Sequence, residues 1–223
     1  MRISFIATCL AVLMAVPVSA QYTVYTEGQT SETPGFEVVA AGQTAMGPVE
    51  VRRYAPYIAA EIEVEAETNR LAASRGFGPL ARYIFGANEP GSRISMTEPV
   101  VTAPAAGGTR ISMTEPVVTA PTSNEGAYTV QFPMPSPWSL DTLPVPEDAR
   151  VSLIEIDART LATQRWLGAR TDAAVERATA LLMAWIDAAG LRAVGPVAVA
   201  QFDSPSVARD RQRWEVQVEV ANR

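Results

Sequence analysis

Apolar and polar residues alternate along seven short stretches of the chain, and this period of two predicts half-buried strands. In the last stretch, Trp214, Val216 and Val218 face one way, while Glu215 and Gln217 face the other. The stretches lie at residues 49–52, 60–65, 128–132, 151–156, 160–166, 197–202 and 213–220. The polar segment before residue 49 has little periodicity, so we expect an extended lead-in there.

A helical period predicts a first helix over residues 68–85, between the second and third of these stretches. Phe77 and Ile84 share its apolar stripe, and Gly86 follows in the C-cap position. Two glycines and a proline between positions 76 and 79 weaken its middle. We therefore expect a kink or a break at that point.

The second predicted helix carries clearer signals. Thr171 is a good N-cap residue, Asp172 complements the helix dipole, and Gly190 ends the helix. The face that we expect to be buried carries Val175, Ala178, Leu182, Trp185 and Ala189.

One segment of twelve residues occurs twice. Residues 93–104 and 110–121 both read Arg-Ile-Ser-Met-Thr-Glu-Pro-Val-Val-Thr-Ala-Pro, at a spacing of seventeen. Alternation within each copy predicts a strand, and the Gly107-Gly108 pair between the copies is a turn signal. We therefore expect a hairpin of two near-identical strands. A single duplication is too short for a solenoid, so it indicates a local repeat inside one domain.

The order strand–strand–helix–strand–strand thus occurs twice, over residues 49–132 and 151–220. It predicts an α+β fold in which two units related by a pseudo-twofold form an antiparallel sheet or a distorted open barrel with two helices. We assign residues 1–20 to a signal peptide, 21–46 to an extended N-terminal segment and 47–223 to the folded domain.

The first twenty residues have the composition of a secretion signal. Arg2 precedes an apolar run over residues 3–16, and Val18-Ser19-Ala20 offers small residues for cleavage. Because the run is short for a membrane span, we expect a periplasmic or secreted bacterial protein that begins near Gln21 and keeps no membrane span. Retention of this segment as an N-terminal anchor is the alternative.

The composition excludes several kinds of chemistry. The chain has no histidine and no lysine, and its one cysteine, Cys9, lies in the signal segment. The mature chain therefore has no thiolate, no Schiff-base lysine, no Ser-His-Asp triad and no cysteine–histidine zinc site. We expect a binding protein and not an enzyme. Because 17 arginines against 24 acidic residues give the mature chain a net charge of −7, we expect no nucleic-acid partner.

Five short motifs occur in a fixed order along the chain. They are Tyr83-Ile-Phe-Gly-Ala-Asn88, Ile94-Ser-Met-Thr-Glu-Pro-Val100, Phe132-Pro-Met-Pro135, Leu143-Pro-Val-Pro146 and Trp214-Glu-Val216. Together they resemble the signature of the SOUL haem-binding protein family, over about residues 47–220. The resemblance implies the pseudo-twofold α+β fold, and reversible, non-covalent binding of haem or another porphyrin as carrier, buffer or scavenger.

The resemblance also implies a place for the porphyrin. Family members without an axial histidine hold it in a hydrophobic cleft against the first helix and the loop before the last strand, with arginines at the propionates. This chain has no histidine, so a His-ligated haem is excluded. Alignment through Tyr83-Ile-Phe-Gly86 carries the site onto Ser74, Arg75, Phe77, Ala81 and Arg82, and onto Arg209 and Arg211 in the loop.

The chain departs from the family pattern at some of these positions. Phe77 and Ala81 stand where some relatives place methionine, and Trp214 stands where an asparagine is common. Phe77 could instead pack in the core. Each of the arginines could instead be a solvated surface charge. Met96 and Met113 lie on predicted strands, where methionine typically fills the core, so we assign no metal ligand.

Two other functions stay open. A non-catalytic binding module could use the same cleft for another hydrophobic ligand or a protein partner, without haem. The second is an enzyme that acts on a tetrapyrrole through its bound iron. The sequence identifies no particular protein partner.

Overall fold

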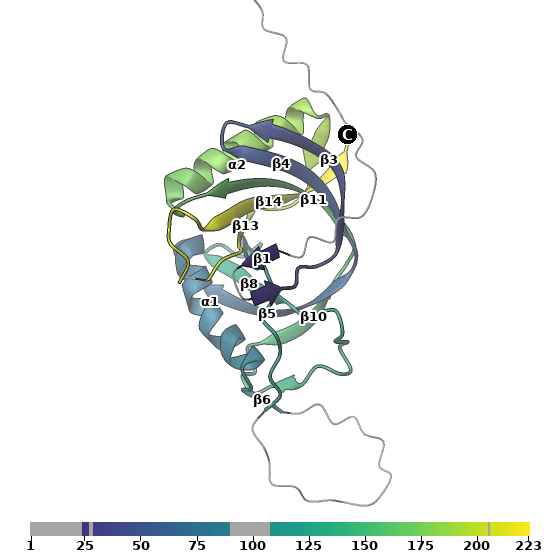
Figure 1. Ribbon diagram of the computed structural model, residues 1–223, viewed down its shortest axis with the longest axis vertical. Coiled ribbons are helices and arrows are strands. Elements are labelled where there is room, and N and C mark those ends of the chain that lie inside the picture. Colours follow the sequence, from purple (N-terminus) through teal and green to yellow (C-terminus); the bar gives the residue numbers. More distant parts are fainter. Residues whose placement is uncertain (1–23, 27–28, 90–107, 205) are drawn as a thin grey trace, which may run out of the picture.

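The computed structural model describes residues 24–26, 29–89, 108–204 and 206–223 (Figure 1). Within these residues, ten strands form one sheet and two helices pack on it. The helices are α1 (Asn69–Ile84) and α2 (Asp172–Ala188). The strands of the sheet are β3 (Phe36–Thr44), β4 (Gly47–Tyr54), β5 (Tyr57–Glu65), β7 (Val117–Pro121), β8 (Ala127–Pro133), β10 (Ser152–Ile156), β11 (Arg159–Leu167), β12 (Leu191–Ala193), β13 (Ala198–Gln201) and β14 (Arg213–Asn222).

The sheet curls into an open half-barrel (Figure 1). Its strands are ordered β10-β5-β8-β7-β13-β14-β11-β4-β3, with β12 paired to the end of β14, and all of them are antiparallel. Two short pairs lie outside the sheet, β1 (Val24–Thr26) with β2 (Gln29–Ser31) and β6 (Asn88–Glu89) with β9 (Val145–Pro146). The α+β prediction is confirmed, whereas a twofold relation between the halves stays a prediction.

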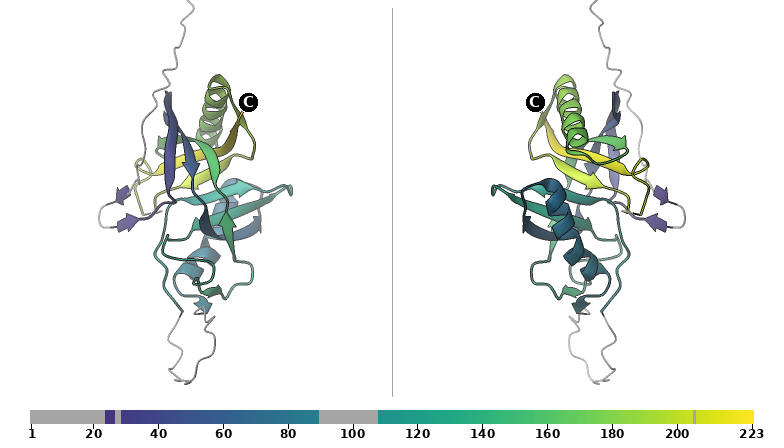
Figure 2. Two further views of the ribbon diagram at one scale, coloured as in Figure 1. Left: turned by 90° about the vertical axis from the view of Figure 1, so that its right-hand side faces the viewer. Right: turned by 90° about the vertical axis from the view of Figure 1, so that its left-hand side faces the viewer.

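Both helices cover the same face of the sheet (Figure 2). Thr119 of β7 is paired with Val130 of β8 and with Val199 of β13, which is paired in turn with Val216 of β14. Directly paired residues point to the same side of a sheet. Val130 belongs to the apolar core under α1, and Val216 belongs to the core under α2. The two cores therefore lie side by side on one face, which we call the helix face.

The opposite face of β14 is polar, and it is also buried. Glu215 is fully buried, and Arg52 donates from Nη1 and Nη2 to its two carboxylate oxygens, each at 2.9 Å. Arg165 Nε and Gln217 Nε2 donate to the same carboxylate at 2.8 and 3.0 Å. Burial would raise the pKa of Glu215, but the two guanidiniums outweigh it and hold this pKa below its usual value. We call these four residues the Glu215 cluster.

Helix α1 continues through the two glycines and the proline, so the predicted break does not occur. Thr68 caps it, with its hydroxyl accepting from the backbone N–H of Leu71. Gly76 faces β8 so closely that a Cβ there would lie 2.5 Å from Cγ2 of Val130. This glycine therefore brings the helix close to the sheet, and the contact supports a helix of weak intrinsic propensity. Pro79 is buried in the same helix.

The second copy of the repeated segment is a strand only in part, and this strand does not pair with the first copy. Within the second copy only Val117–Pro121 is a strand, β7, and both edges of β7 are taken, by β8 and β13. Ile111 is buried while Met113 is 39% exposed, so they do not share the buried side of a strand. Just before this copy, the Asn88 side chain bonds the backbone N–H and C=O of Thr109, both at 2.8 Å. The first copy, with Met96, lies outside the described residues.

The sheet also begins earlier than the sequence predicts, because β3 pairs with β4 along the edge. The edge strand β3 precedes the expected start of the domain at residue 47. The proposed signal segment lies outside the described residues. Among the helices that are described, none has the length and hydropathy needed to cross a membrane.

Candidate functional site

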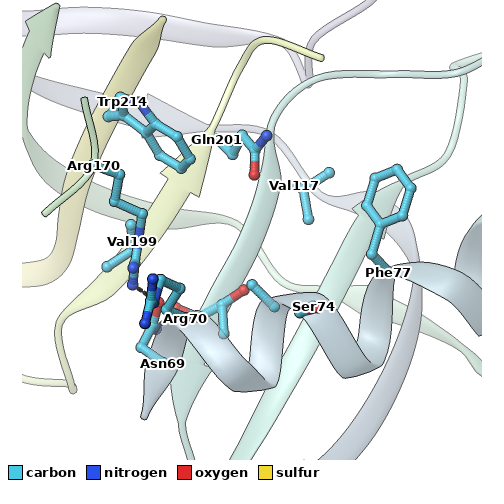
Figure 3. Close-up of a pocket in the computed structure, with 11 residues that line it drawn as sticks. Asn69, Arg70, Ser74, Phe77, Val117, Arg170, Val199, Gln201 and Trp214 are labelled. Atoms are coloured by element: carbon cyan, nitrogen blue, oxygen red, sulfur yellow. Dashed lines mark hydrogen bonds between the residues drawn. The ribbon is translucent and has the colours of Figure 1, made fainter. Parts of the chain in front are cut away.

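A cavity of about 300 Å³ separates the first half of α1 from strands β7, β13 and β14 (Figure 3). It lies on the helix face, between the two apolar cores. We call it the α1 cavity. Its walls are formed by Asn69, Arg70, Ala73, Ser74, Phe77, Val117, Thr119, Arg170, Val199, Gln201 and Trp214.

The helical residues of the α1 cavity fall on one stripe. Positions 69, 70, 73, 74 and 77 are spaced so that they share one face of an α-helix. Phe77 closes the far end, with its ring edge against Phe132 at a centroid distance of 5.4 Å. Val117 and Val199 supply apolar surface from the sheet. The cavity is therefore mainly apolar toward Phe77 and polar toward the start of the helix (Figure 3).

The polar end is built around Arg170, from the loop before α2. Arg170 Nη2 donates to Asn69 Oδ1 at 2.8 Å, and Asn69 Nδ2 donates to the Thr119 carbonyl at 3.0 Å. The Arg170 side chain is only 9% exposed, and its Nη1 has no hydrogen bond among the described residues. Asp172 is its ion-pair partner, at 3.9 Å through a largely exposed side chain.

The electrostatics of this end are unbalanced. Burial lowers the pKa of the Arg170 guanidinium, Asp172 partly offsets this effect, and the like charge of Arg70 lowers the pKa further. Arginine nevertheless keeps its proton in proteins. The buried indole Nε1 of Trp214 likewise has no hydrogen-bond partner within the described chain. The polar end therefore carries the positive charges of Arg70 and Arg170.

A wider depression of about 520 Å³ adjoins the α1 cavity and shares Arg70, Arg170 and Trp214 with it. We call it the arginine depression, because Arg209 is a third arginine in its wall. The whole lining consists of Arg70, Ala169, Arg170, Thr171, Asp172, Arg209, Gln212 and Trp214.

The structure separates the residues that the family resemblance assigns to the site. Ser74 and Phe77 line the α1 cavity, and Arg209 lines the arginine depression. Ala81 is buried outside both linings. Arg211 is exposed and also lies outside them.

Two more of the assigned arginines point elsewhere. Arg75 donates to the backbone carbonyl of Glu65, and Arg82 lies 3.7 Å from Asp148 with its side chain 61% exposed. Neither lines the α1 cavity or the arginine depression.

Sequence reasoning missed the polar end of the cavity. Stepping back from Phe77 by one helical turn at a time reaches Ala73 and Asn69, so helical spacing alone could have extended the site toward the start of α1. Arg170 gave no local signal, because its hydrogen bond to Asn69 joins residues 101 positions apart. Trp214 was noted as a departure from the family pattern, and it lines the cavity.

The lining fits the acidic and apolar parts of a porphyrin but not its iron. Apolar walls suit the macrocycle, and the guanidiniums of Arg70 and Arg170 suit carboxylates. No residue in the lining is a histidine, cysteine, methionine or tyrosine, the side chains that ligate haem iron in proteins. Among the described residues, no group of three or more acidic, histidine or cysteine side chains could hold a metal ion.

The sequence profile of the family described as "SOUL heme-binding protein" matches residues 31–219, most of the chain. The chain belongs to the SOUL family. The match begins before β3 and ends within β14, so the SOUL region includes the edge strand that precedes residue 47. The family is one of binding proteins, known for haem and tetrapyrrole binding.

Solved structures share the fold of this SOUL protein at low identity. The C-terminal domain of EcmrR superposes with a TM-score of 0.56 at 11% identity, covering 78% of this chain and 98% of that one. EcmrR in its complex with DNA superposes with a TM-score of 0.55 at 12% identity, covering 78% of this chain and 57% of that one. A hydrolase from Listeria innocua superposes with a TM-score of 0.50 at 12% identity, covering 78% of this chain and 91% of that one. These likenesses show the fold alone. A comparison with curated proteins found no match.

Proposed function

We propose that this SOUL protein binds haem or a related tetrapyrrole reversibly in the α1 cavity, as a carrier, buffer or scavenger. The observation that carries the proposal is a mainly apolar cavity on the helix face with the guanidiniums of Arg70 and Arg170 at one end. The family match supports the ligand class. Because the chain has no histidine, the proposed complex has no histidine ligand to iron.

Each part of the α1 cavity has a role in this proposal. Phe77, Val117 and Val199 present apolar surface to the flat faces of the macrocycle. Arg70 and Arg170 meet its carboxylates, and the Trp214 side chain forms part of the wall beside them. Bound iron would supply redox chemistry of its own, whereas the side chains of the cavity only bind, orient and shield the ligand.

Secretion belongs to the same proposal. A carrier or scavenger of an external tetrapyrrole acts outside the cytoplasm, and the apolar run that follows Arg2 supports export. N-terminal sequencing of the protein from a bacterial host would test this step. A chain that begins near Gln21 in the periplasmic fraction is expected, and an intact N-terminus in the cytosol would contradict it.

Titration of the purified mature protein with hemin tests the proposal directly. We expect a shifted Soret band and quenched tryptophan fluorescence at micromolar hemin, because Trp214 lines the cavity. The spectrum should lack the signature of a histidine ligand. Absence of both changes at micromolar hemin would end the haem proposal.

A cavity-filling variant locates the bound ligand. Ala73→Leu adds bulk inside the α1 cavity and should weaken hemin binding at least tenfold, with the fold retained. Ala184→Leu is the matched control, because Ala184 is an exposed residue of α2. Equal affinities for the two variants would place the ligand elsewhere.

The size of the α1 cavity favours a second candidate from another class. About 300 Å³ is at the lower end of the range for small-molecule cavities, and no lining residue ligates iron. A non-catalytic module that binds a smaller apolar anion, without haem, fits these two observations. Displacement of a fluorescent apolar anion by aliphatic carboxylates, with no Soret change on addition of hemin, would favour this candidate.

A further inference from the structure

The arginine depression lies where both helices begin. Asn69 is the first residue of α1, and Asp172 is the first residue of α2. The backbone N–H groups at a helix start carry partial positive charge and attract anions. Residues at both helix starts line this one depression, since Arg70 belongs to the first turn of α1, and Thr171 and Asp172 belong to the start of α2.

Side-chain charge has the same sign as the helix starts. Arg70, Arg170 and Arg209 line the depression, against Asp172 as its one acidic lining residue. This leaves an excess of two positive charges in a protein whose overall charge is negative. Neither Arg70 nor Arg209 has an ion-pair partner within the described part of the chain.

Two residues of the lining also carry buried donors without a hydrogen bond. The Arg170 side chain is 9% exposed, and its Nη1 lacks a hydrogen bond within the described residues. Trp214 is 7% exposed, and its Nε1 also lacks a hydrogen-bond partner within the described residues. Buried donors in folded proteins almost always have a partner, so these two residues of the lining retain hydrogen-bonding capacity that the described residues do not use.

We propose that the arginine depression binds a small oxyanion of the phosphate class. A phosphate group carries about 1.5 to 2 negative charges near neutral pH, which matches the excess of positive charge in the lining. Its oxygens accept from the guanidiniums that line the depression, those of Arg70, Arg170 and Arg209. The proposal stands without haem, although Arg70 and Arg170 line the α1 cavity as well.

Calorimetric titration of the full chain with sodium phosphate tests the site, with ionic strength held constant by sodium chloride. We expect one phosphate per chain, and about tenfold weaker binding in Arg170→Met. Arg70→Met should lose a similar amount of phosphate affinity. Because Arg70 is exposed, this variant should fold normally even if Arg170→Met does not. Arg192→Met is the control. It removes the same charge from exposed β12, where Arg192 pairs with Ala221 at the far end of β14 from Trp214.

Asp172→Asn gives a result in the opposite direction. Removal of the one acidic lining residue should strengthen phosphate binding several-fold. A wild-type chain that shows no phosphate binding at millimolar concentration, or an equal loss in Arg192→Met and Arg170→Met, would overturn the proposal.

The haem proposal is decided separately by the Soret band in phosphate-free buffer.

Titration of phosphate in the presence of hemin or of hemin dimethyl ester identifies the source of the oxyanion in the arginine depression. Competition between phosphate and hemin, but not hemin dimethyl ester, assigns the depression to porphyrin carboxylates as well as to phosphate. Phosphate binding that neither compound disturbs assigns it to the free anion.

Discussion

Two pairs of arginines lie on opposite faces of the same sheet, and their surroundings differ. On the face without helices, Arg52 and Arg165 enclose the fully buried carboxylate of Glu215. On the helix face, Arg70 and Arg170 have no enclosed carboxylate, and Asp172 reaches Arg170 at 3.9 Å from solvent. The first pair has its anion built into β14. The second pair borders the α1 cavity and the arginine depression.

This difference in partners distinguishes the two pairs without reference to sequence motifs. A buried ion pair with satisfied hydrogen bonds holds strands together, and removing one partner leaves an uncompensated charge. Arg170 instead has a buried Nη1 without a hydrogen bond among the described residues, so part of its hydrogen-bonding capacity is unused. Under the proposed function, the first pair of arginines holds strands together and the second pair binds a ligand.

The largest expected effect is on the face without helices. Glu215→Gln removes the charge that Arg52 and Arg165 share, so we expect a loss of about 3–5 kcal/mol in the free energy of unfolding. Urea denaturation would measure it. Glu219→Gln, at an exposed position of the same strand, should stay within about 0.5 kcal/mol of wild type. Equal stability of the two variants would contradict a structural role for the Glu215 cluster.

Acid should remove part of the same stabilisation. The folded state holds the pKa of Glu215 below its usual value of 4.5, because Arg52 and Arg165 outweigh the effect of burial. This contribution is fully present above the unfolded pKa, and it is lost as the pH falls through the folded pKa. The stability difference between wild type and Glu215→Gln should therefore shrink below about pH 4.5. If the stability difference between wild type and Glu215→Gln grew as the pH fell, the result would contradict a lowered pKa of Glu215.

On the helix face, substitution of an arginine should affect ligand binding more than folding. Arg170→Met removes a buried charge that is only weakly paired, so we expect hemin affinity to fall by about 1.5–3 kcal/mol. Its unfolding free energy should change much less than that of Glu215→Gln. Soret titration and urea denaturation of the same sample would measure both. If Arg170→Met lost stability and kept its affinity for hemin, Arg170 would have the structural role that we assign to Arg52 and Arg165.

The smallest expected effect is at Arg82, which the family resemblance places in the site. Its side chain is 61% exposed and lies 3.7 Å from Asp148, outside the α1 cavity. We expect Arg82→Ala to change hemin affinity by less than about 0.5 kcal/mol, as exposed charges usually do. A loss of about 1–3 kcal/mol would instead show that Arg82 binds a propionate.

The sequence predicted the strands and helices well where local signals are strong. Thr171 caps α2 as expected, and period-two alternation found β5, β8 and β14. It failed where long-range contacts decide. Gly76 weakens a helix in isolation, but its contact with Val130 favours the helix in the fold. Alternation also gave no sign that Glu215 is buried, because its partner Arg52 is 163 positions away.

The candidate site shows the same limit. Ser74 and Phe77 follow from one helix and one family motif, and both line the α1 cavity. The arginines that border the cavity come from the start of α1 and from the loop before α2, which meet through Asn69 and Arg170. No pattern along the chain predicts that meeting, since it depends on how the two helices are placed on the curled sheet.

The Asn88 side chain joins two segments of the chain that lie 21 positions apart, because it bonds the backbone N–H and C=O of Thr109, both at 2.8 Å. Asn88 is only 2% exposed, and its amide nitrogen also donates to the Tyr83 carbonyl at 2.7 Å. These bonds need a donor and an acceptor on one short side chain, which an amide supplies and a carboxylate does not. The asparagine that ends the motif Tyr83-Ile-Phe-Gly-Ala-Asn88 is therefore explained by the backbone that it ties together.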